Sequence, residues 1–200
     1  MSKIDDTTGN LTASNELSNI NSVIEFVTSH KNWKTMASNF KQSQEIFFLA
    51  NGGNLSILTH LVSDFKRQNV LKRYVLPTEI VHFSNMVREA DHATYFRKWL
   101  EHEIVLTQNP FLFCVASNTD SYSIMDALNC SSADKFTKFL LTFNSPQPSN
   151  NNYTHIDMGV SYYATGEIAL LQLGYMLLEL IHSPPKKIPP ITFEITKDFS

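Results

Sequence analysis

The sequence predicts an α/β domain in which helices cover both faces of a parallel sheet. Short, continuously apolar segments such as 46–50 and 111–116 alternate with longer stretches in which apolar residues recur every three or four positions. Uninterrupted apolar strands are typical of parallel sheets that are buried on both faces, and alternating strands and helices favour a doubly wound fold. A chain of 200 residues with 42% apolar residues is long enough for one such domain.

The expected strands are short apolar runs bounded by Gly, Pro, Asn, Asp or Ser. In chain order they are 46–50, 79–83, 111–116, 139–143 and 154–158, of which the last is the weakest. The helices are expected where apolar residues fall on one face. They run from Glu16 to Phe40 with a break at 30–32, over 55–65, from a cap at Asp91 to Leu100, through 127–128, and over 165–181.

The two ends of the chain differ from this pattern. Residues 1–14 are polar with few large apolar side chains, which predicts a disordered lead. Four prolines follow residue 183 and predict an extended, Pro-rich tail over 184–200. The sequence therefore predicts a single folded domain over 15–183.

Composition excludes several classes of protein. A net charge of −3 gives no general attraction to nucleic acid, and the basic stretch 66–73 is interpreted as a solvated helix end. The start of the chain lacks a secretory signal, and no apolar run reaches the roughly 18 residues that span a bilayer. Cys114 and Cys130 are too few for a disulfide framework or a cysteine-only zinc site. We expect a cytoplasmic protein with free thiols.

Two loops follow the strongest strands, at the edge where ligands bind in parallel sheets. In the first, Asn51–Asn54, the adjacent Gly52 and Gly53 can adopt positive φ, and the next helix offers its N-terminus to an anion. In the second, 117–123, hydroxyls could bind phosphate, although Asp120 would repel it. Each loop also has a plainer interpretation, as a strand-to-helix turn or as a helix cap.

His60 and Asp64 are four residues apart on one helix and share a face. This spacing suits metal ligation or an acid/base pair, and it is also common in surface hydrogen bonds. Glu167, near the start of the last helix, is a third candidate if the fold brings it close.

The segment Phe47-Phe48-Leu49-Ala50-Asn51-Gly52-Gly53-Asn54, followed by His60 and Asp64, resembles the strand–GNGGS–helix–His–acid segment of the sugar isomerase (SIS) family. The most similar branch is sedoheptulose-7-phosphate isomerase (phosphoheptose isomerase) and its non-enzymatic relative, the DnaA initiator-associating protein. The stretch 113–123 is similar to the family's phosphate loop, and 165–181 to its C-terminal helix.

The resemblance implies a three-layer αβα sandwich with a five-stranded parallel sheet, assembled as a homotetramer with sugar-phosphate sites between subunits. In the isomerase branch, a zinc ion and acid/base groups interconvert ketose and aldose phosphates. Carried over by position, His60, Asp64 and Glu167 match three zinc-binding and catalytic positions, with Asp for Glu and Glu for Gln. Tyr175 falls where the fourth ligand, a His, is expected.

The same comparison implies a set of sugar-phosphate contacts: Asn51, Gly52, Gly53, Asn54, Glu89, Ser117, Thr119 and Ser121. Within this set Asn54 stands for a Ser, while Asp120 takes a glycine position beside it. Together with Tyr175, these departures weigh against catalysis.

Two hypotheses follow. The first is a protein that binds a phosphorylated sugar, with a degenerate zinc site and, if active, an aldose–ketose isomerase activity. The second is a non-catalytic tetrameric scaffold or regulator of the DnaA initiator-associating type, with a protein partner. A third hypothesis is a domain that resembles the SIS family in structure alone. None of these binds nucleic acid directly or requires a membrane.

Overall fold

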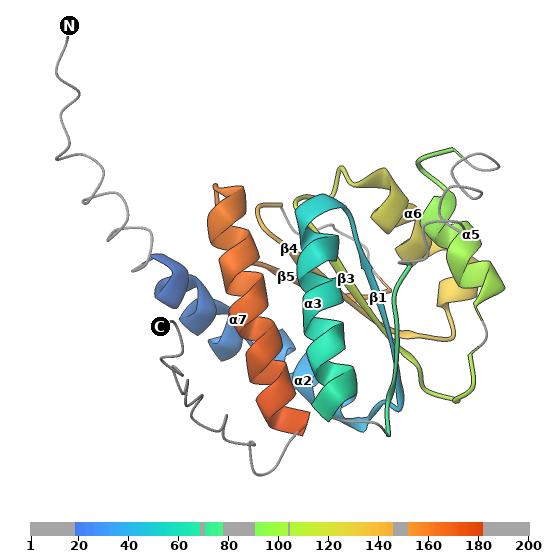
Figure 1. The fold of residues 1–200 in the computed structure, drawn as a ribbon. Coiled ribbons are helices and arrows are strands. Elements are labelled where there is room, and N and C mark those ends of the chain that lie inside the picture. Colours follow the sequence, from blue (N-terminus) through green and yellow to red (C-terminus); the bar gives the residue numbers. More distant parts are fainter. Residues whose placement is uncertain (1–18, 69–70, 78–90, 104, 146–151, 182–200) are drawn as a thin grey trace, which may run out of the picture.

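The structure, a computed structural model, describes residues 19–68, 71–77, 91–103, 105–145 and 152–181. A five-stranded, all-parallel sheet in the order β2-β1-β3-β4-β5 lies between two layers of helices (Figure 1). Its strands are β1 (Glu45–Ala50), β2 (Arg73–Val75), β3 (Phe111–Ala116), β4 (Thr137–Thr142) and β5 (Thr154–Asp157). The predicted αβα sandwich with a five-stranded parallel sheet is confirmed.

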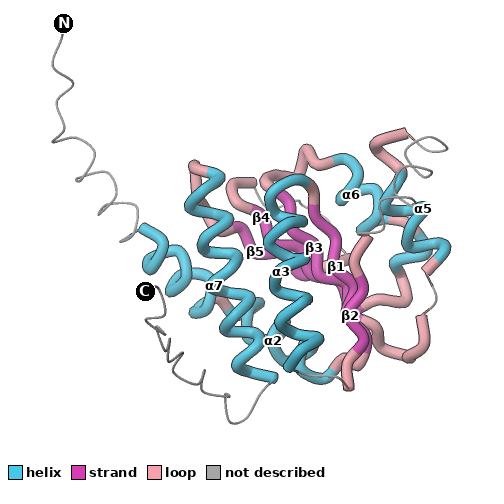
Figure 2. The backbone as a smooth tube through the Cα atoms, viewed as in Figure 1, coloured by secondary structure: helices cyan, strands magenta, loops and turns pink. Residues whose placement is uncertain are grey.

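The helices divide between the two faces of the sheet (Figure 2). One layer holds a helix at residues 19–29, α2 (Lys31–Gln42), α3 (Gly52–Gln68) and α7 (Tyr163–Ile181). The other holds α5 (Tyr95–His102), α6 (Tyr122–Asn129) and the 3-10 turn η1 (Ser131–Ala133). Asp91 caps the turn before α5, because its Oδ1 accepts hydrogen bonds from the N–H groups of Ala93 and Thr94.

The strands are buried on both sides, as their continuous apolar runs predict. Successive residues of a strand point to opposite faces. In β1, Ile46 and Phe48 therefore pack in the core with α2, α3 and α7, while Phe47 and Leu49 pack with α5 and α6. Every residue of β1 and β3 is buried.

The edge strand β2 was not predicted. The strand expected at 79–83 lies outside the described residues, and the strand beside β1 is Arg73–Val75. It is only three residues long and begins with an Arg, so its apolar pattern is too short to recognise. Besides its backbone pairing with β1, an ion pair joins the two strands: Arg73 Nη1 lies 2.7 Å from Oε1 of the buried Glu45.

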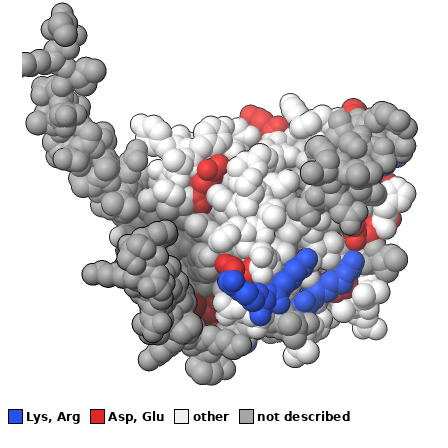
Figure 3. Space-filling view, viewed as in Figure 1, with Lys and Arg blue, Asp and Glu red and all other residues white. Residues whose placement is uncertain are grey.

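The basic stretch 66–73 divides into two parts. Lys66 and Arg67 occupy the last turn of α3 and are exposed, as predicted, and Figure 3 shows basic side chains gathered near that end of the helix. Lys72 and Arg73 do not extend a helix. The Lys72 ammonium donates to the carbonyl oxygens of Phe40, Lys41 and Ser43, at the end of α2. This half of the interpretation as a solvated helix end was wrong.

Helices α3 and α7 run parallel and in close contact. Gly174 lies directly against Leu61, and eight residues of α7 are buried. Among the described residues, α7 alone has the length and apolar composition to span a bilayer, and 44% of its most apolar window is buried within the fold. Its packing is therefore that of a core helix. The lead 1–14 and the tail 184–200 lie outside the described residues, so the domain boundaries stay predictions.

Candidate functional site

The strand order reverses between β1 and β3, and open parallel sheets bind ligands at the carboxyl edge beside such a reversal. The two predicted loops meet there. The Asn51 side-chain amide donates to the Ser123 hydroxyl at 3.1 Å, and the Tyr95 hydroxyl donates to Asn51 Oδ1 at 2.5 Å. Ser123 is 1% exposed. The Asn51 side chain is thus a structural link between the loops.

The glycine turn has the predicted positive φ at Gly52 and not at Gly53. Gly52 has a φ of +55°, which lets β1 turn directly into α3. Gly53 lies against Glu167: a Cβ at this position would lie 3.0 Å from Cδ of Glu167, so the carboxylate would have to shift. The Glu167 carboxylate therefore lies over the first turn of α3, where the positive end of the helix dipole favours an anion. The chain itself supplies the negative charge at this helix end.

The loop after β3 satisfies most of its own donors. The N–H groups of Thr119, Asp120 and Ser121 donate to Ser145 Oγ, Asn118 Oδ1 and the Asn118 carbonyl, respectively. Within the described part of the chain, the Ser117 and Ser121 hydroxyls have no hydrogen-bond partner, so they are the loop's available groups.

A hydrogen-bonded chain behind this loop was missed by the sequence analysis. Ser145 contacts the Thr119 hydroxyl at 2.7 Å, and its N–H donates to Asp157 Oδ1 at 3.0 Å. The Thr142 hydroxyl donates to the same oxygen and lies 2.7 Å from His155 Nε2. Burial lowers the pKa of His155, which favours the neutral ring. No sequence signal marked this network, because its members lie on two strands and an irregular loop.

A pocket of about 200 Å³ opens beside the same loop. Ser117 and Asn118 line it from the end of β3, Asn144 from the end of β4, and Ser161 and Tyr163 from the start of α7. Asp120 is exposed and does not line this pocket.

His60 and Asp64 share a face of α3 as predicted, and they meet Tyr175 of α7. His60 Nε2 is 3.0 Å from the Tyr175 hydroxyl, which donates to Asp64 Oδ2 at 2.9 Å. Arg67 Nη2 lies 2.6 Å from the other Asp64 oxygen. Burial, reinforced by the hydrogen bond to Asp64, raises the pKa of Tyr175 and keeps its hydroxyl protonated.

Glu167 is not part of this cluster. It lies beside Gly53, seven residues before His60 on α3, or about 10 Å along the helix axis. Nowhere in the described ranges do three or more His, Cys, Asp or Glu side chains form a group that could hold a metal ion. The residues present therefore do not fit the zinc site that the resemblance implies. Glu89, the expected substrate contact, lies outside the described residues.

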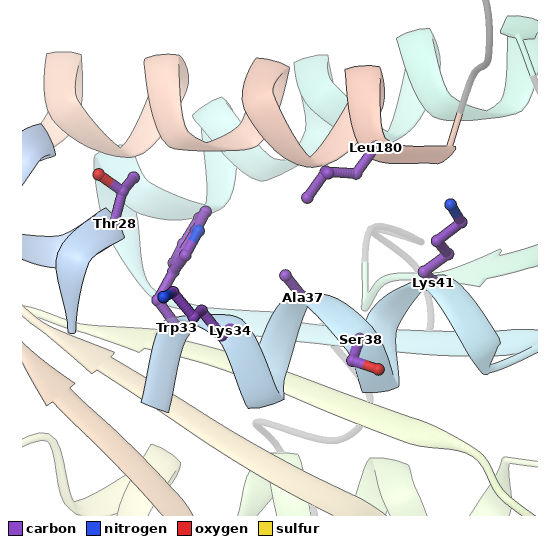
Figure 4. Close-up of a pocket in the computed structure, with 7 residues that line it drawn as sticks. All are labelled: Thr28, Trp33, Lys34, Ala37, Ser38, Lys41 and Leu180. Carbon is purple, nitrogen blue, oxygen red and sulfur yellow. The ribbon is translucent and has the colours of Figure 1, made fainter. Parts of the chain in front are cut away.

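A second hollow, of about 400 Å³, lies between α2 and the end of α7 (Figure 4). Trp33, Ala37 and Leu180 form its apolar walls, and Lys34 and Lys41 also line it. It lies away from the carboxyl edge, and no predicted site residue lines it.

The fold is similar to that of several solved structures. Phosphoheptose isomerase from Neisseria gonorrhoeae aligns with a TM-score of 0.72 at 12% identity, covering 88% of this chain and 98% of the isomerase. A phosphoheptose isomerase from Francisella tularensis gives a TM-score of 0.69 at 15% identity, with 87% and 97% covered. The NanR protein from Vibrio vulnificus, solved in complex with ManNAc-6P, gives 0.55 at 11% identity, with 87% of this chain and 61% of NanR covered.

These similarities confirm the SIS fold that the glycine-turn segment predicted. No protein-family model matches the sequence, and no curated protein matches it.

Proposed function

We propose that this chain, which has the fold of the phosphoheptose isomerases, binds a phosphorylated sugar at the carboxyl edge of its sheet, in the cytoplasm. The observation that carries the proposal is the reversal of strand order between β1 and β3, where the two loops are joined through Asn51 and Ser123. Open parallel sheets bind ligands at such a reversal of strand order. The Vibrio vulnificus NanR protein, whose matching part has the same fold and which was solved with the sugar phosphate ManNAc-6P, supports the same ligand class.

The phosphate group is best accommodated in the pocket beside the loop after β3. The first turn of α3 is a poor phosphate site, because the Glu167 carboxylate already lies over it and would repel a second anion. The pocket lined by Ser117 and Ser161 offers hydroxyls beside the N-terminus of the 19-residue helix α7. The free N–H groups and the dipole of that helix end attract an anion.

The volume of this pocket limits what it can enclose. At about 200 Å³ it is smaller than the roughly 300–1,000 Å³ of typical ligand pockets. It suits a phosphate group, with the sugar extending out along the carboxyl edge of the sheet towards the glycine turn.

Calorimetric titration with sedoheptulose 7-phosphate, and with the unphosphorylated sugar as control, tests the proposal. We expect saturable binding of the phosphate ester alone. A hydrogen bond to a charged group contributes about 1.5–3 kcal/mol, so Ser117→Ala should weaken binding about 10- to 100-fold. Ser131→Ala, an exposed serine in η1, is the matched control and should change nothing. Equal binding of both sugars, or of neither, would contradict the proposal.

We propose binding without isomerisation. Both Asp64 oxygens are engaged, one by Arg67 and one by Tyr175, so this carboxylate is poorly placed to act as a base. An aldose–ketose isomerase needs such a base free to reach the substrate. Incubation with sedoheptulose 7-phosphate should therefore yield no aldose product. Measurable turnover would contradict this part of the proposal and support an active isomerase.

A homotetramer, as either hypothesis from the resemblance expects, is part of the proposal. Ile168 and Tyr175, two turns apart on one face of α7, are exposed at 50% and 37% of their surfaces. Exposed apolar residues on one face of a helix favour a contact with another copy or a protein partner. Light scattering should give four times the 22.8 kDa of the chain, and a strictly monomeric protein would contradict this part.

A further inference from the structure

We propose that the cluster of His60, Asp64 and Tyr175 holds no zinc ion. Instead it forms a hydrogen-bonded link between α3 and α7. The Tyr175 hydroxyl occupies the place where a third metal ligand would be needed. The hydroxyl lies 3.0 Å from His60 Nε2 and 2.9 Å from Asp64 Oδ2. The two would-be ligand atoms are 3.6 Å apart. An ion bound to both would also touch the tyrosine.

The donor set is too small for zinc. Protein zinc sites use Cys, His, Asp or Glu side chains, with at least three such ligands even when a water completes the coordination. This cluster supplies one imidazole and one carboxylate, and Glu167 lies about 10 Å away along the helices.

The charge of the cluster also disfavours a dication. Arg67 Nη2 lies 2.6 Å from Asp64 Oδ1, so a guanidinium already neutralises the carboxylate. The second oxygen accepts the tyrosine proton. A zinc ion would have to break this hydrogen bond and sit close to a positive charge.

The arrangement ties the two helices together without a metal. The Tyr175 hydroxyl donates to Asp64 and accepts from the ring N–H of His60, so all three groups are satisfied across the interface. The inference does not depend on the proposed function, because its test contains no sugar phosphate.

The test is metal titration of the full-length chain and of Tyr175→His, after both are shown to be folded by circular dichroism. Zinc binding is measured by calorimetry, and Co²⁺ absorption reports whether the ion is tetrahedrally coordinated. We expect the unaltered chain not to bind zinc through His60, so His60→Ala should leave the titration of the unaltered chain unchanged. Supplying a third ligand should tighten binding by at least about 10- to 100-fold, and His60→Ala should remove that gain.

Two controls complete the design. Tyr175→Phe removes the hydroxyl without adding a ligand and should not bind zinc. If Tyr175→His fails to fold, Tyr175→Cys supplies the third ligand instead. Stoichiometric zinc in the unaltered chain that depends on His60 would overturn the inference. Folded Tyr175→His with no gain in affinity would overturn the assignment of Tyr175 to the missing ligand's place.

Discussion

Gly174 lies at a close contact between α3 and α7, and its replacement by Ala tests the packing that places Tyr175 beside His60. A Cβ at this position would lie 2.7 Å from Cδ2 and 3.0 Å from Cγ of Leu61, with Cδ1 nearer still. Ordinary Cβ contacts are 3.4–4 Å, so the Leu61 side chain would have to move. Leu61 is 1% exposed, and the cavity that it lines together with Gly174 is only about 10 Å³, which leaves little space for the side chain to move.

Two effects oppose each other in this substitution. Ala is favoured over Gly inside a helix by about 1 kcal/mol. Overpacking of a filled core costs about 1–3 kcal/mol or more. We therefore expect Gly174→Ala to lower the free energy of unfolding by about 0–2 kcal/mol. For a chain of 200 residues this is a fall in Tm of at most about 8 °C.

Urea unfolding followed by circular dichroism measures the effect, with Gln172→Ala on the exposed face of α7 as the control. In the Leu61→Ala background the new methyl group enters a cavity, so Gly174→Ala should become neutral or stabilising. The cycle should show a coupling of about 1–3 kcal/mol. A gain of about 1 kcal/mol from Gly174→Ala alone would refute the close packing of α7 on α3.

Substitutions at three other residues, Gly52, Glu45 and His155, have predicted effects on stability. Gly52→Ala, at a φ of +55°, should destabilise the fold by about 1–2 kcal/mol in urea unfolding, and Gly52→Asn by less. Burial alone would raise the pKa of Glu45, but hydrogen bonds from Arg73 and the 106–107 loop hold that pKa below its ordinary value. The ionised Glu45 therefore stabilises the fold above about pH 4.5, and this stabilisation is lost as the pH falls below that value. The stability difference between the unaltered chain and Glu45→Gln should shrink in acid. Burial lowers the pKa of His155, so protonation should destabilise the fold as pH falls from about 7 to 5, and His155→Asn should flatten that slope.

The fold could be predicted from the sequence because its central strands carry a redundant signal. The continuous apolar runs around Phe48 and Phe113 and the glycines at 52–53 each predict a buried strand or a strand-to-helix turn. The edge strand β2 carried no such signal. It is only three residues long and pairs on one side only, and it contacts β1 partly through the ion pair between Arg73 and Glu45, residues that are far apart in the sequence.

The site was predicted in part. Helical spacing correctly placed His60 beside Asp64, and the loops joined by Asn51 meet as expected. Spacing could not show that Glu167 would lie over Gly53 instead of beside His60, because that depends on the register between α3 and α7. That register is set by close packing at small residues, which a one-dimensional pattern does not record.

The location of the phosphate group is the central claim, and a crystal structure of the chain with sedoheptulose 7-phosphate tests it most directly. We expect density for the phosphate in the pocket formed by Ser117, Asn144 and the start of α7, with the Asn51–Ser123 hydrogen bond unchanged. Phosphate over Gly53, with the Glu167 carboxylate displaced from the first turn of α3, would contradict the account.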